Sequence, residues 1–102
     1  MDGSAVETKV AELEKMISDA SVEAVVVVAQ LEDGDEVYYS LERASRNRGF
    51  LVLLTEDRGV IDVYPVSQLS AAEIFDAVIQ AIEEGAEREV VSVKFEKVER
   101  VY

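Results

Sequence analysis

The chain has 102 residues, 49% of them apolar, and its formal net charge at neutral pH is −12. Cysteine and histidine are both absent, which excludes disulfides, thiolate and imidazole nucleophiles, and metal sites built on these ligands. The negative charge repels phosphate backbones, so we expect no direct binding of nucleic acid.

The length fits one domain, and the apolar content is enough for one packed core. We therefore expect a single α+β domain over residues 1–102, with a disordered N-terminus at residues 1–3. The first residues lack a basic start followed by an apolar run, which predicts a cytoplasmic protein. The longest apolar stretches are far shorter than the roughly 20 residues that a membrane helix needs, so we expect no membrane contact.

The first predicted element is a helix from about Ser4 to Asp19. Ser4 is followed three places later by Glu7, the spacing of a capping box. Apolar side chains recur along this segment with the period of a helix and form one narrow stripe. They are Val6, Val10, Leu13, Ile17 and Ala20.

The strands are predicted from runs of apolar residues. Ala24–Gln30 and Phe50–Leu54 are apolar at nearly every position, which indicates burial on both faces of a sheet. Val60–Tyr64 follows a glycine-containing turn and forms a hairpin with the run before it. Glu89–Tyr102 alternates at first and then shifts phase at Val98 and Val101, as a bulge in an edge strand would do.

Two structures remain open for the segment between the first two strands. As a helix from about Asp35 to Arg48, capped at Asp33, it presents an apolar face and ends at Gly49. As a hairpin, residues 31–36 form a turn and Val37–Leu41 forms a strand of β-favouring residues. We favour the helix, because its cap, its face and its stop agree with one another.

The last helix is predicted from about Ala71 to Glu84. Ser70 and Glu73 have capping-box spacing, and Leu69 and Ile74 stand where a hydrophobic staple would pack. Its apolar arc is wide, which predicts the best-buried helix of the protein. Gly85 offers the left-handed residue that ends it.

Together these elements have the βαββαβ order of a ferredoxin-like (split βαβ) antiparallel sheet, with an additional N-terminal helix. Because the first strand is apolar on both sides, the second sheet face should not be left in water. Either the first helix covers that face or a second copy of the protein does.

One acidic cluster has the residue types of a cation site. Glu32, Asp33, Asp35 and Glu36 could hold Mg²⁺ or Ca²⁺ through carboxylate oxygens. They lack the spacing of an EF-hand loop, and capping of the helix explains the same residues. We therefore predict no metal and no cofactor.

The best candidate for contact with a partner is a small basic patch. If the middle segment is a helix, Tyr39, Arg43 and Arg46 lie together on its outer face at one-turn spacing. Tyrosine and arginine are the residues most often found as binding hot spots. An ordinary alternative is that these cations complement the end of the helix dipole.

These patterns favour a non-enzymatic protein-interaction or regulatory module that forms a homodimer, with an unidentified protein partner. One alternative is a small acidic inhibitor that imitates nucleic acid and binds a nucleic-acid-handling protein. The other is a divalent-metal site built on carboxylates.

Overall fold

The computed structural model describes residues 1–99, which form two helices and five strands. The predicted phase shift at Val101 and the predicted strand end at Tyr102 lie outside these residues. In chain order the elements are α1 Gly3–Ser18, β1 Val22–Leu31, β2 Glu36–Arg43, β3 Phe50–Thr55, β4 Val60–Pro65, α2 Ala71–Ala86 and β5 Val90–Glu99.

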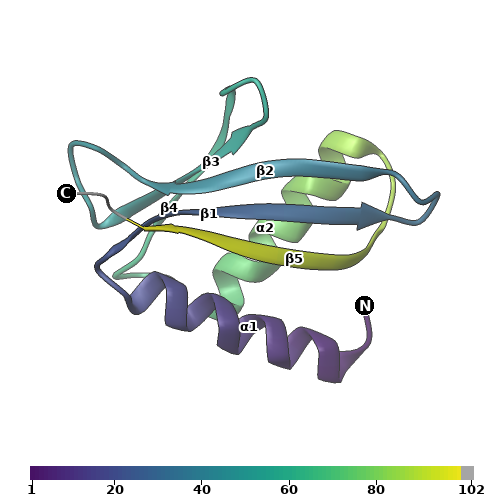
Figure 1. Ribbon diagram of the computed structural model, residues 1–102, viewed down its shortest axis with the longest axis horizontal. Helices are drawn as coiled ribbons and strands as arrows, with labels where there is room; N and C mark the ends of the chain where they lie inside the picture. The colour runs from purple at the N-terminus through teal and green to yellow at the C-terminus, as the bar shows by residue number, and fades with distance from the viewer. Residues whose placement is uncertain (100–102) are drawn as a thin grey trace.

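The strands form one antiparallel sheet in the order β4-β3-β2-β1-β5 (Figure 1). The first four strands follow one another as a meander, and α2 then carries the chain back so that β5 pairs with β1. The predicted α+β class and antiparallel sheet are confirmed, but the ferredoxin-like arrangement is wrong. That fold interleaves its strands through two helical crossovers, whereas within residues 1–99 only α2 is a crossover between strands.

The predicted middle helix, residues 35–48, is the source of this error. The segment is a tight turn followed by β2, as the hairpin alternative has it. Leu31 N–H donates to Asp35 O at 2.8 Å, and Gly34 adopts a φ of 92°, a conformation open to glycine at little cost. β2 forms ladders with β1 on one side and β3 on the other. Two long-range ladders outweigh a local helical pattern.

Both helices pack on the same face of the sheet. Figure 1 shows α2 crossing behind the strands and α1 running beside β5. Leu13 of α1 and Ile82 of α2 are at most 1% exposed and join the inward residues of the sheet in one core. Phe75 of α2 meets Phe95 of β5 edge to face, with ring centroids 6.2 Å apart. This face of the sheet is therefore the interior of the protein.

Of the two alternatives for the second sheet face, the one in which the first helix covers it is wrong. The apolar stripe of α1 packs against the same core as α2, with Leu13 buried in it, which enlarges one interior rather than building two. Within residues 1–99, no helix lies over the other face. That face carries the alternate residues of every strand, and we call it the open face.

Each helix begins and ends for a local reason. The cap of α1 is Asp2, whose carboxylate accepts from Ala5 N at 3.0 Å, and not Ser4 as predicted. The predicted capping box of α2 is confirmed, because Ser70 and Glu73 each bond the other's backbone N–H. Gly85 does not end α2; the chain turns at Glu87, whose φ is 56°.

The two candidate serine caps give a direct test of these helix starts. Ser70→Ala should lower the free energy of unfolding by about 1 kcal/mol, the usual cost of a lost N-cap. Ser4→Ala should change it by less than about 0.5 kcal/mol, because Ser4 lies within the first turn of α1 and such surface changes are small. Urea unfolding of both variants measures this, and equal losses would contradict the caps assigned here.

Candidate functional site

The open face is defined by the register of the strands. Val25, Val27 and Ala29 of β1 point into the core, so the residues between them point the other way. Cα partners across a ladder share a face, which extends the assignment to the whole sheet. Its apolar members are Ala24, Val26, Val28, Tyr38, Phe50, Val52, Leu54, Val60, Val63 and Val98.

The open face is apolar in the middle, and its side chains are exposed to solvent at the margins. Val28 and Leu54 are only 6% and 7% exposed, although no helix of residues 1–99 covers them, because the side chains around them shield them. Tyr38 and Phe50 stand out further and are exposed. Antiparallel sheets that face water normally alternate apolar and polar residues. An open face with a Val and Leu centre has instead the composition of a contact surface.

The charges on the open face largely cancel. Glu42 lies on it in β2, and both its oxygens accept from the Arg58 guanidinium while it also accepts from Ser40 Oγ at 2.8 Å. The Arg58 hydrogen bond, more than any other contact, holds the pKa of Glu42 below its usual value. On β5, Lys94 and Glu96 present one charge of each sign. Glu36, opposite Gln30 in the ladder, adds one further carboxylate.

The helical side of the protein has a different charge. α1 and α2 together carry seven Asp and Glu residues and two lysines. Every ionisable side chain of α2 is acidic. Seven carboxylates against two lysines give the helices a net charge of −5, so the helical side of the protein is clearly acidic.

The structure separates the three residues predicted to form a contact patch. Tyr39 faces the core and is half-buried against α2, where a Cβ placed on Gly85 would lie 3.4 Å from the tyrosine hydroxyl. Arg43 lies on the same side of β2 near its end. Arg46 is exposed in the connection between β2 and β3. The helical spacing behind the patch is wrong, since β2 alternates its side chains between faces.

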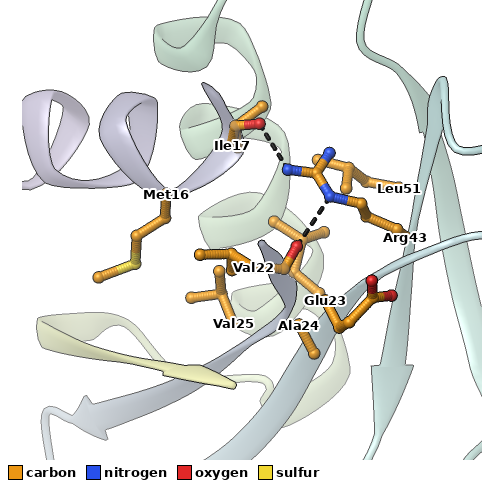
Figure 2. A pocket seen from close by; sticks show the side chains of 9 residues that line it. Met16, Ile17, Val22, Glu23, Ala24, Val25, Arg43 and Leu51 are labelled. Carbon is orange, nitrogen blue, oxygen red and sulfur yellow. Dashed lines mark hydrogen bonds between the residues drawn. The ribbon is translucent and has the colours of Figure 1, made fainter. Parts of the chain in front are cut away.

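Arg43 has a structural role that the sequence did not indicate. Its Nε donates to Val22 O at 2.8 Å, and its Nη2 donates to Ile17 O at 2.7 Å (Figure 2). Nη2 also donates to Asp19 O at 2.9 Å. These carbonyls belong to the end of α1 and the start of β1. The cavity beside this guanidinium holds about 10 Å³, which is room for no more than about one water. Arg43 thus clamps the α1–β1 connection and lines no ligand pocket.

Two carboxylates of the acidic turn between β1 and β2 already share an arginine of the chain. Arg88, which follows α2, reaches the carboxylates of both Asp33 and Asp35. The Arg88 hydrogen bond is the main reason that the pKa of Asp33 is lowered, and Asp35 N–H also donates to it. Residues 1–99 contain no group of three or more acidic side chains placed to hold a metal ion.

Comparisons with known protein families, with curated proteins and with solved structures found no match. Across the described residues, neither helix has the length and apolar content to cross a membrane.

Sequence reasoning identified part of the open face and missed the rest. The uninterrupted apolar runs of β1 and β3 already indicated a second apolar surface. Tyr38 was missed because the middle segment was favoured as a helix. The signal for it was present, since Tyr38 falls between Val37 and Tyr39 in a run of β-favouring residues.

Replacing Arg43 tests its role as a clamp. Arg43→Met should lower the free energy of unfolding by about 2 kcal/mol, because it leaves partly buried carbonyls without their charged donor. Arg46→Met removes the same charge from an exposed connection and should cost less than about 0.5 kcal/mol. Urea unfolding of the two variants decides between a clamp and a surface patch, since a patch predicts small losses for both.

The Arg88 contacts predict a specific dependence of stability on pH. A folded pKa below the unfolded value of 3.8 makes Asp33 stabilising above pH 3.8, and that contribution is lost as pH falls through the lowered pKa. Arg88→Met removes the cause of the shift. Its urea midpoint should therefore fall below that of the unchanged chain by the largest amount at neutral pH, and the difference should shrink below pH 3.8. Arg46→Met should show no such convergence. A deficit for Arg88→Met that is constant from pH 7 to about 2 would contradict the pairing.

Proposed function

We propose that the protein is a non-enzymatic interaction module that forms a homodimer by packing its open face against that of a second copy. The observation that carries this proposal is a sheet face over which no helix lies within residues 1–99 and on which Tyr38, Phe50 and Val63 are exposed. Exposed apolar patches of this kind mark association surfaces in soluble proteins.

The size of the open face supports this proposal. Five strands spaced about 4.8 Å apart give a width of about 24 Å, and strands averaging about eight residues give a length of about 26 Å. The projected area is then about 600 Å². Stable interfaces bury about 800 Å² of accessible surface on each partner, and accessible area exceeds projected area, so one face is large enough.

Charge favours a second copy as the occupant. Two molecules with a net charge of −12 repel each other, and contact is least costly where the local charge is smallest. The helical side is acidic, whereas the open face pairs Glu42 with Arg58 and offers both Lys94 and Glu96. A two-fold axis between the faces would let Lys94 of each copy approach Glu96 of the other.

A charge placed on the open face should prevent dimerisation. Val63 is 48% exposed on the outer strand β4 and belongs to the open face. We expect the unchanged chain to have twice its monomer mass of 11.3 kDa at tens of micromolar. Val63→Lys should have the monomer mass, because each interface would bury two unpaired ammonium groups. Light scattering coupled to gel filtration measures both.

The matched control is Val91→Lys. Val91 is 45% exposed on the other outer strand, β5, at a register shift next to the core residue Val90 and outside the open face. This variant should remain dimeric. A monomer mass for the unchanged chain at these concentrations, or equal dissociation of both variants, would refute dimerisation through the open face.

A further inference from the structure

A second surface lies on the opposite side of the molecule, between the two helices. It is a groove of about 490 Å³ along the outside of α1. Because it is on the helical side, it stays accessible when the open face is occupied. It is therefore independent of the proposed dimer.

The floor of the groove is apolar. It is formed by Val6, Val10 and Ala11 of α1 and Ala72 of α2. Val6 and Val10 belong to the same stripe as the buried Leu13, yet both are only half-buried. The small side chains of Ala11 and Ala72 leave space between the two helices. The two helices thus leave unburied part of the apolar surface that normally seals such a contact.

The rim of the groove is acidic. Glu7 and Glu14 lie along α1, two turns apart, and Asp76 faces them from α2. One cation, Lys15, stands at the end of the groove. None of the three carboxylates is in an ion pair with a side chain of residues 1–99. Their charge is thus available to a partner.

The shape and charge together define the occupant. A second copy of the chain is disfavoured, because its helices bring the same excess of carboxylates. A small ligand would need convergent buried polar groups to orient it, and the groove offers an apolar floor with exposed carboxylates at its edge. An amphipathic helix with an apolar stripe and flanking lysines or arginines matches both features.

We propose that the groove between α1 and α2 binds a cationic amphipathic helix of a protein partner. The apolar stripe of that helix packs on Val6, Val10 and Ala72, and its cations pair with Glu7, Glu14 and Asp76. From Val6 to Lys15 the groove follows about 14 Å of α1, at about 1.5 Å per residue. A partner helix of three to four turns spans it.

The test uses a fluorescein-labelled Leu/Lys peptide of about 14 residues, which is about 21 Å as a helix, and the full chain. Fluorescence anisotropy should show saturable binding. Glu7→Lys/Glu14→Lys should weaken it at least tenfold, because both rim charges are reversed. The matched control, Glu56→Lys/Glu84→Lys, makes the same change in net charge at exposed sites outside the groove. It should bind within twofold of the unchanged chain.

A second peptide separates groove binding from attraction to an acidic protein in general. A Ser/Lys peptide of equal charge and length lacks the apolar stripe and should bind at least tenfold more weakly than the Leu/Lys peptide. The monomeric variant Val63→Lys should bind the Leu/Lys peptide as the unchanged chain does. Equal binding of both peptides, or equal weakening by both double variants, would overturn the assignment of this groove.

Discussion

The structure depends on β1, which pairs with β2 and β5 and packs against the helical layer. It is the first strand of the meander, and within residues 1–99 it is the only strand of the meander that pairs with β5. Its inward residues Val27 and Ala29 are fully buried under the helices, and its outward residues Ala24 and Val26 are apolar as well. A two-layer fold can cover only one side of such a strand. Everything distinctive about the surface follows from this excess of apolar side chains.

The charges are arranged in a way that fits this constraint. The helical layer has surplus carboxylates, which keep that side hydrated and resist stacking of like molecules. The open face has instead an internally paired Glu42 and Arg58 and one charge of each sign on β5. Arginines also close the ends of the fold, with Arg43 on the carbonyls after α1 and Arg88 on the turn between β1 and β2. Two of the ten lysines and arginines of the chain thus hold connections in place.

Sequence predicted those parts of the fold whose causes are local. The capping box of Ser70 and Glu73 and the apolar runs of β1 and β3 carry their structure within a few residues. The prediction for β2 was wrong because Val37 and Leu41 fit a helical face and a strand equally well. The ladders with β1 and β3 make this segment a strand. The helical spacing expected for the contact patch was wrong for the same reason. The role of Arg43 depends on the end of α1 and the start of β1, which only the folded chain brings beside it. Long-range partners of this kind leave no local pattern.

The two surfaces make opposite demands on a partner, and this is why they can coexist on so small a chain. Self-association requires an apolar face on which the charges of two copies do not repel each other strongly. The open face meets this requirement because its charges largely cancel. The groove between the helices has a smaller apolar floor and an acidic rim, so it gains most from an oppositely charged partner. If open faces pair about a two-fold axis, both grooves point outward on opposite sides of the dimer. Two cationic helices tethered in one partner would then bind with an effective concentration set by their linker.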